Sequence, residues 1–253
     1  MIQSLYSAAS GISNQQLRID TIANNISNVN TTGYKSSRLN FRDAFYTTMK
    51  SPENAGGAAN MAKGTGVMPA STDLDFTQGT VADTGNALDF AIQGSGFFGL
   101  RDSAGNIRYT RNGSFSISKE GDGSYLTADD GAYVLDSGGQ KIKLPDDGTA
   151  VIAAGDGSIS AADGKTVKLG VYKFSNPGGL SKTGDSRFAE TGASGKAAAA
   201  TGFKVRQAAL EGSNVELSDE ITDLMQAQRV FSLSCRALDT ADEMEGLANN
   251  IRK

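Results

Sequence analysis

Both ends of this chain carry an apolar repeat with helical spacing. The N-terminal repeat runs through Leu5, Ala8, Ile12, Gln15, Ile19, Ile22, Ile26 and Val29, and the C-terminal repeat runs through Leu217, Ile221, Leu224, Gln228, Phe231, Cys235 and Leu238. Steps of three and four residues place these side chains along one stripe of an α-helix, as at the a and d positions of a coiled coil. The sequence therefore predicts two terminal helices that can pair, either within a subunit that assembles end to end or as an ordinary helix hairpin.

The limits of the two helices follow from local signals. The first helix is expected over residues 3–30, because Gly33 offers a left-handed terminator. The second has two possible starts, a capping box at Ser213 and an N-cap at Ser218. Beyond Leu238 the apolar stripe drifts onto Ala241, Met244, Ala248 and Ile251. A strict heptad is therefore not kept, and long-range supercoiling is not secured.

The first predicted helix is almost uncharged. Its only charged residues are Arg18 and Asp20, and the face away from the stripe consists of Ser, Asn, Gln and Thr. A solvent-exposed helix usually carries Glu and Lys pairs on its outer face. The neutral outer face indicates contact with further protein on more than one side, which favours assembly over a simple hairpin.

The middle of the chain has the pattern of antiparallel β structure. Short strands are predicted at residues 87–92, 97–101, 107–111, 114–118, 124–128, 133–135, 141–144, 167–174 and 204–208. Turn signals such as Asn112-Gly113 and Asp130-Gly131 separate them. The small-residue stretches 50–68 and 191–202 are predicted to be a loop or mobile arm and a flexible excursion.

These patterns predict an α+β fold with three parts. Residues 1–32 and 213–253 are expected to form a coiled-coil-like helical domain. Residues 69–212 are expected to form a central, mostly antiparallel β domain. Residues 33–68 connect the two and include an extended arm.

Composition excludes several classes of function. The chain has 253 residues, no histidine, one cysteine and a formal net charge of -4. Histidine-based catalysis, Cys/His zinc sites and an internal disulfide are therefore excluded, and the acidic balance argues against nucleic-acid binding. Cys235 is interpreted as a small buried hydrophobic residue. No stretch is apolar enough to cross a membrane, and the start lacks a cleavable signal, which fits a cytoplasmic protein or export by another route.

Two further motifs have candidate chemistry. Residues 94–99 match G-x-G-x-x-G, but a β stretch follows them where a dinucleotide site needs a helix, so these glycines are expected to bend a strand around Phe97 and Phe98. The pairs Asp129-Asp130 and Asp146-Asp147 could act as catalytic carboxylates or calcium ligands. Solvated turn residues are the favoured interpretation, because neither pair has the spacing of a calcium loop.

The segment from Ala23 to Lys35 resembles the signature of bacterial flagellar rod and hook proteins. The matching residues are Ala23, Asn24, Asn25, Asn28, Thr32, Gly33, Tyr34 and Lys35. Four further segments resemble the same family, namely residues 4–11, 88–98, 109–115 and 210–215. Within the family, Gly64-Thr-Gly-Val67 and the arm before it resemble the distal-rod type, whereas the tail at 242–249 is closer to the proximal-rod type.

This resemblance implies a structural subunit without enzymatic activity or cofactors. It implies export through the flagellar type III apparatus without signal cleavage, and helical stacking into a hollow drive shaft in the basal body, outside the cytoplasmic membrane. The expected partners are copies of the same chain, other rod and hook proteins, and possible surrounding bushing rings, with no nucleic acid and no membrane insertion. The alternatives are a proximal rod or hook-type axial subunit, a secreted wall hydrolase using Asp130 or Asp147, and a surface adhesin.

Overall fold

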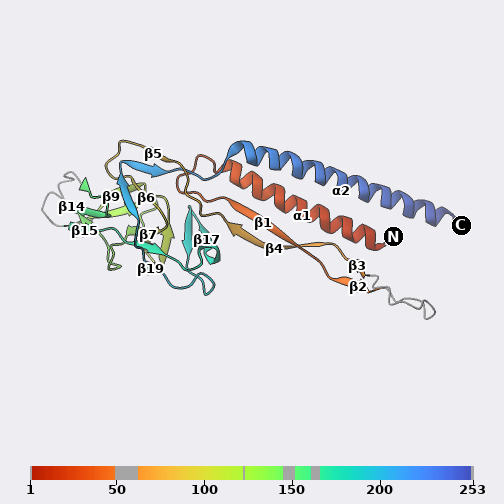
Figure 1. The fold of residues 1–253 in the computed structure, drawn as a ribbon, viewed down its shortest axis with the longest axis horizontal. Coiled ribbons are helices and arrows are strands. Elements are labelled where there is room, and N and C mark those ends of the chain that lie inside the picture. The colour runs from red at the N-terminus through yellow and green to blue at the C-terminus, as the bar shows by residue number, and fades with distance from the viewer. Residues whose placement is uncertain (1, 49–61, 122, 145–151, 161–165, 252–253) are drawn as a thin grey trace. The chain divides into compact units, whose positions relative to one another are not determined.

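The computed structural model describes the chain except for residues 1, 49–61, 122, 145–151, 161–165 and 252–253 (Figure 1). It divides into two compact units, each built from segments far apart in the sequence. The helical unit comprises Met1–Ser27, Ser37–Asp73 and Glu216–Lys253, and the β unit comprises Asn28–Ser36 and Leu74–Val215. The predicted α+β class is confirmed. Most of the predicted arm and the Asp146-Asp147 pair lie outside the described residues.

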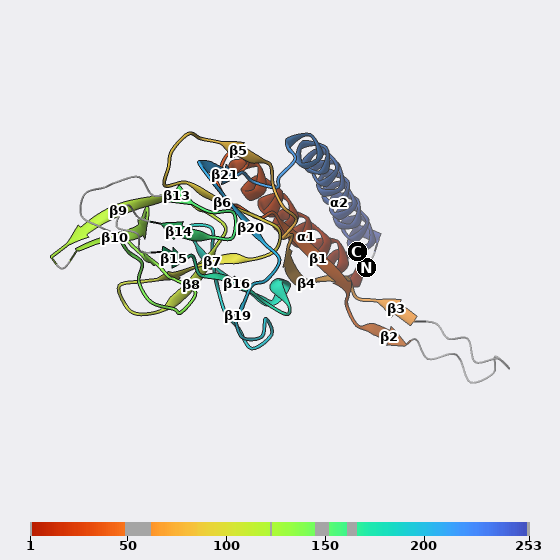
Figure 2. The same ribbon diagram turned by 60° about the vertical axis from the view of Figure 1, so that its left-hand side comes forward.

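The helical unit contains two long helices that run antiparallel, side by side (Figures 1 and 2). They are α1, Ile2–Ser27, and α2, Leu217–Ile251. The helix prediction is wrong at both inner ends. The backbone forms turns from Asn28 onward, and Glu216 directly precedes α2, so neither Ser213 nor Ser218 is its N-cap. Neither described helix is apolar over a length that could span a bilayer.

The segment after α1 forms β-strands where a connecting segment was predicted. Strands β1, Ser37–Asp43, and β4, Val67–Leu74, form one two-stranded sheet. Strands β2, Tyr46–Thr48, and β3, Ala62–Gly64, pair antiparallel. The sequence did not indicate β4 because most of its side chains are exposed, so it lacks the apolar alternation of a half-buried strand.

The strands of the β unit pair antiparallel, as predicted. Its main sheet joins β12 (Lys143–Leu144), β10 (Gly123–Ala128), β11 (Tyr133–Val134), β7 (Phe97–Arg101), β8 (Ile107–Thr110), β18 (Arg187–Ala189) and β17 (Ser181–Gly184) in that order, with β9 (Phe115–Glu120), β16 (Val171–Lys173) and β19 (Ala198–Ala199) attached. Smaller sheets pair β13 (Ile152–Ala153), β14 (Ser158–Ser160) and β15 (Thr166–Lys168), then β6 (Phe90–Gln93) with β20 (Lys204–Gln207), and β5 (Val81–Asp83) with β21 (Ala209–Glu211). A short 3-10 helix, η1, covers Pro177–Gly179.

Two corrections concern segments of this unit. The single strand predicted at 167–174 is two strands, β15 and β16, and between them the Gly170 amide donates to the Leu135 carbonyl. The predicted flexible excursion at 191–202 is tied down instead. Its strand β19 pairs with β16, and Ser194 is fully buried and hydrogen-bonded to Thr191. A run of small residues predicts a flexible segment, but small side chains also permit tight packing, and in this segment they are packed.

The core of the β unit lies on both faces of β7. Successive side chains of a strand point to opposite faces, so Phe97 and Phe98 enter different apolar clusters. Phe98 packs with Phe90 and Phe115, whereas Phe97 packs with Phe174 and Phe188. The predicted pair of core phenylalanines is confirmed, and the β unit is held together from two sides of one strand.

Candidate assembly surface and buried ion cluster

The predicted N-terminal stripe lies on the protected side of α1. Leu5, Ala8, Ile12, Gln15, Ile19 and Ile26 are half-buried and Ile22 is buried, while Val29 is half-buried in the turn beyond α1. On α2 the protected side follows Leu224, Phe231, Cys235 and Leu238. Its most buried residue is Ala227, which the predicted stripe missed; its small side chain permits close helix packing.

Three positions of the α2 stripe differ from the prediction, two at its start and one in its middle. Leu217 and Ile221 are exposed, and so is Gln228. Asn25, in the last turn of α1, already lies opposite Glu220 of α2, so Leu217 stands at the end of the helix pair. The described part of the chain thus leaves the apolar side chains of Leu217 and Ile221 exposed.

Two buried asparagines tie α1 to its neighbours. The Asn25 side-chain amide donates to the Ser37 carbonyl at 3.0 Å and to the Glu220 carboxylate at 2.9 Å, while its carbonyl oxygen accepts from the Ser37 amide. The Asn14 side chain donates to the Val67 carbonyl. Burial raises the pKa of Glu220, and the hydrogen bond from Asn25 opposes that shift. Asn25 therefore joins both helices and β1, which gives one asparagine of the signature a structural role.

An open groove of about 450 Å³ runs along the helix pair. It is lined by Ala9, Ile12, Ser13, Gln16, Leu17, Phe231 and Leu238. Large apolar side chains are also exposed elsewhere on both helices, with Tyr6 69%, Leu233 62% and Leu247 63% exposed. Exposed apolar surface of this extent marks a site of protein contact.

The second half of the signature, residues 28–35, belongs to the β unit. There the backbone of Gly33 lies close against the backbone of Asn112. The φ of Gly33, +66°, is left-handed, and a Cβ at this position would lie 2.4 Å from the backbone nitrogen of Asn112. The Gly33 amide donates to the Glu211 carbonyl at 2.8 Å, and the Thr32 hydroxyl donates to the Asn112 side chain. Only glycine fits here, because both the backbone angle and the space exclude a side chain.

We expect Gly33→Ala to lower the free energy of unfolding of the β unit by about 1–3 kcal/mol or more, because backbone strain and a steric clash act together. The matched control is Gly85→Ala. Gly85 is also left-handed, at φ +75°, but has open space around it. Urea unfolding followed by circular dichroism compares the two variants. Equal losses would contradict the close approach at Gly33.

A buried ion cluster lies next to this turn. The Lys35 ammonium is 2.6 Å from one carboxylate oxygen of Glu211, and the Arg111 guanidinium is 3.0 Å from the other. All three side chains are buried. Lys35 also donates to the Thr77 carbonyl at 2.7 Å, and the Gly79 amide donates to Glu211 at 3.1 Å. Two cations thus share one carboxylate away from water.

Burial dominates the electrostatics of the cluster. It lowers the pKa of Lys35 and of Arg111, and the charge of Glu211 opposes both shifts. Taking charges out of water is costly, and the attraction to Glu211 offsets that cost only while all partners are in place. Arg111 also donates to the Gly94 carbonyl at 2.8 Å and lies over the Phe97 ring, 5.4 Å from its centroid.

The cluster brings together three segments that resemble the flagellar family. Lys35 comes from the N-terminal signature, Arg111 from residues 109–115 and Glu211 from residues 210–215. The side chains of Asn214 and Lys182 also reach this region, donating to the Asp75 and Lys35 carbonyls. The sequence marked the segments but not the role of Arg111 or Glu211, because a charged residue in a turn pattern is ordinarily solvated.

The glycine motif and Asp130 have structural roles. Residues 94–96 join β6 to β7, and no helix follows them, so the context of a dinucleotide site is absent from this described segment. Asp130 is ion-paired with Arg187 and accepts from the Ala132 amide. The hydrogen bond from Arg187 lowers the pKa of Asp130, which makes it unsuitable as a general acid. Among the described residues, no cluster of His, Cys, Asp or Glu could hold a metal ion.

Three family models match separate parts of the chain. The flagella basal body rod protein model matches residues 5–35, the model of the flagellar hook protein FlgE/F/G D1 domain matches residues 91–161, and the flagellar basal body rod FlgEFG protein C-terminal model matches residues 206–251. The first covers α1 from Leu5 onward and the signature through Lys35, and the third covers Glu211 and α2. All three residues of the ion cluster therefore lie in matched segments, Arg111 in the second, and so do nearly all residues of both helices.

Similar full-length proteins agree with these matches. Flagellar basal-body rod protein FlgG of Bacillus subtilis is 38% identical over 261 residues, covering 96% of this chain and 97% of that protein. FlgG of Borreliella burgdorferi is 35% identical over 271 residues and covers both chains completely. Flagellar hook-basal body complex protein FlhP of Bacillus subtilis is 30% identical over 270 residues. On this similarity along its whole length, the chain belongs to the family of flagellar basal-body rod proteins.

Proposed function

We propose that this protein is a structural subunit of the flagellar rod, of the distal type, which assembles helically into a hollow shaft that carries torque to the hook. The observation that carries the proposal is the apolar surface that α2 leaves exposed. Leu217, Ile221, Met225, Val230, Leu233, Met244 and Leu247 are all exposed. Apolar residues spread around a helix need cover on several sides, which the described part of the chain does not supply.

The geometry of assembly follows from the same surface. The helix pair offers a groove on one side and exposed apolar residues on others, so neighbouring chains meet through unlike surfaces. Contacts of this heterologous kind give an open helical filament when their rotation does not close into a ring. We infer that α1 and α2 pair as a coiled-coil-like domain, from residues 1–32 and 213–253, and that neighbouring copies cover the remaining apolar stripe.

The partners and location follow from this role. Other rod and hook proteins would continue the same packing at either end of the shaft, and the residues 69–212 would face neighbouring subunits or surrounding rings. The location is the flagellar basal body, reached by export without a cleaved signal peptide. The chain acts as a structural protein and not as an enzyme, in keeping with the names of its relatives.

The direct test is deletion of the gene followed by imaging of basal bodies. We expect non-motile cells with rods that stop before the hook, and recovery when the gene is supplied again. A labelled copy should lie at the distal part of the rod. Label at the proximal part would replace the distal assignment, and normal swimming of the deletion strain would contradict the proposed function.

A further inference from the structure

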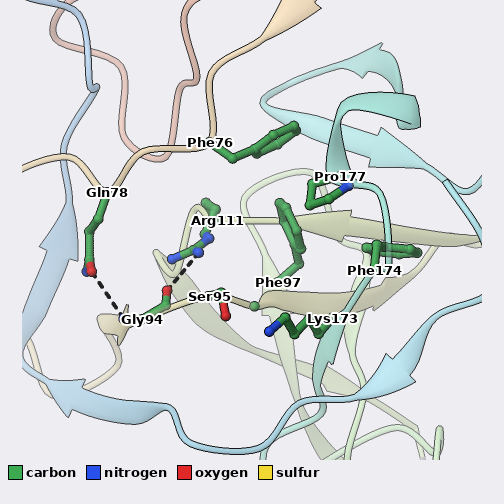
Figure 3. A pocket seen from close by; sticks show the side chains of 10 residues that line it. Phe76, Gln78, Gly94, Ser95, Phe97, Arg111, Lys173, Phe174 and Pro177 are labelled. Atoms are coloured by element: carbon green, nitrogen blue, oxygen red, sulfur yellow. Dashed lines mark hydrogen bonds between the residues drawn. The ribbon is translucent and has the colours of Figure 1, made fainter.

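A pocket of about 270 Å³ lies on the β unit beside the ion cluster (Figure 3). Three of the residues that line it are aromatic, Phe76, Phe97 and Phe174, and Pro177 lies with them. The rings of Phe76 and Phe97 already meet edge to face, with centroids 5.4 Å apart. A further aromatic ring would extend this arrangement, because edge-to-face packing is the geometry that aromatic rings prefer.

Two cations give the pocket a polar side. Arg111 and Lys173 line it, and Lys173 is exposed at its wall. The Nε of Arg111 is buried and has no hydrogen-bond partner among the described residues, although both Nη atoms are bonded. With Lys35 and Glu211, Arg111 leaves a net positive charge on the buried cluster. The pocket therefore suits an aromatic side chain that arrives with an acidic group or another acceptor.

The chain itself exposes a side chain of this kind. Phe45 is 87% exposed, the largest exposed fraction among the large hydrophobic residues of the described chain. It follows β1, and two residues before it lies Asp43, whose carboxylate also bonds the Tyr46 hydroxyl. Arg42 precedes Asp43 and points to the opposite face of the strand. An exposed phenylalanine beside an acidic group matches an aromatic pocket beside two cations.

We propose that this pocket receives Phe45 of a second copy of the chain, with Asp43 of that copy facing Lys173. The proposal rests on the proposed function, because it requires copies to assemble. A projecting side chain and a pocket at different places on one chain make a heterologous contact, which extends from copy to copy without closing. The ring also comes within reach of the Arg111 guanidinium and the Lys173 ammonium, so cation–π attraction adds to apolar burial.

The test is disulfide cross-linking between two single-cysteine variants, Ala44→Cys and Ser95→Cys, each carrying Cys235→Ala. Both are co-expressed, and basal bodies are isolated, oxidised and separated on a non-reducing gel. Ala44 flanks the inserted ring and Ser95 lies at the pocket wall, so the pair should bring the two thiols within bonding range. With the two variants expressed equally, we expect about half of the incorporated protein to shift from monomer to dimer mass, because each variant meets the other at about half of its contacts.

Matched variants identify the residue that fills the pocket. Phe45→Ala added to the Ala44→Cys chain should abolish the dimer, whereas Tyr46→Ala, which removes an aromatic ring that is 59% exposed, should leave it. If the cysteines prevent assembly, Phe45→Ala and Tyr46→Ala in the natural chain decide instead. Phe45→Ala should then reduce the protein incorporated into basal bodies, and Tyr46→Ala should not.

Several outcomes would overturn the inference. Normal rods without the dimer would exclude this contact while leaving the proposed function intact, and absence of the natural chain from basal bodies would reject the proposed function itself. A cross-link within an isolated monomer carrying both cysteines would show that the pocket is filled by its own chain. A dimer formed through Tyr6→Cys and Ser95→Cys, in place of Ala44→Cys, would assign the pocket to α1 of the neighbour.

Discussion

Glu211→Gln is expected to lower the free energy of unfolding of the β unit by about 3–5 kcal/mol, because it leaves two buried cations without their shared partner. Glutamine has nearly the same shape as glutamate, so the loss reports charge and not packing. The side chains of Glu211, Lys35 and Arg111 are all buried, so water cannot replace the carboxylate as the partner of either cation. Urea unfolding followed by circular dichroism measures the loss.

Lys35→Met is expected to lower the free energy of unfolding less than Glu211→Gln does. It removes one of the two cations and leaves Arg111 and Glu211 as a neutral pair. The expected loss in the free energy of unfolding is about 1–3 kcal/mol, because the Thr77 carbonyl loses the hydrogen bond from Lys35. Glu216→Gln, at an exposed position, should change stability by less than about 0.5 kcal/mol. A larger loss for Lys35→Met than for Glu211→Gln would contradict the charge argument.

Leu233→Asp is expected to abolish rod assembly while the stability of the free chain changes by no more than about 0.5 kcal/mol. Leu233 is 62% exposed on α2, so a charge there meets water in the free chain. In the proposed rod the same charge is buried by a neighbouring copy without a partner, which is costly. Motility and the amount of the protein in isolated basal bodies measure assembly, and circular dichroism measures stability.

Two comparisons separate assembly from folding of the helical unit. Ile19→Asp and Leu224→Asp introduce the same charge on the protected side of the helix pair, so they should weaken the helices of the free chain as well as assembly. Ser103→Asp adds a charge at an exposed turn of the β unit and should change neither property. Normal motility with Leu233→Asp would show that this face of α2 is not covered in the rod.

Local sequence pattern predicted both helices and about half of the strands, namely β6 to β12, β15, β16 and β20. Strand β7 was predicted with its observed limits, because it begins after a glycine-rich turn and carries two core phenylalanines. The terminal helices were predicted with errors of a few residues at their inner ends. Strands β1 to β5, β13, β14, β17 to β19 and β21 were missed. In β1 and β4 the side chains are largely exposed or half-buried and show no apolar alternation. Segments without a periodic pattern of apolar residues therefore could not be assigned as strand or loop from the sequence.

The candidate site was predictable only in part. The repeat marked the stripe of α1 and most of the stripe of α2, but exposure of Leu217 and burial of Ala227 depend on where α1 ends beside α2. The signature asparagine Asn25 was singled out by resemblance, whereas its bonds to Ser37 and Glu220 were not foreseeable. A hydrogen bond between residues 195 positions apart leaves no local pattern in the sequence.

By itself, the sequence determined that the chain has two terminal helices with unsatisfied apolar stripes around an antiparallel β region. It could do so because side-chain periodicity is a property of neighbouring residues. Only the tertiary structure decided that Lys35, Arg111 and Glu211 form one buried cluster, and that an aromatic pocket opens beside it. The physical reason is that burial depends on contacts between distant segments: Lys35 and Glu211 are 176 positions apart, and folding alone removes them from water.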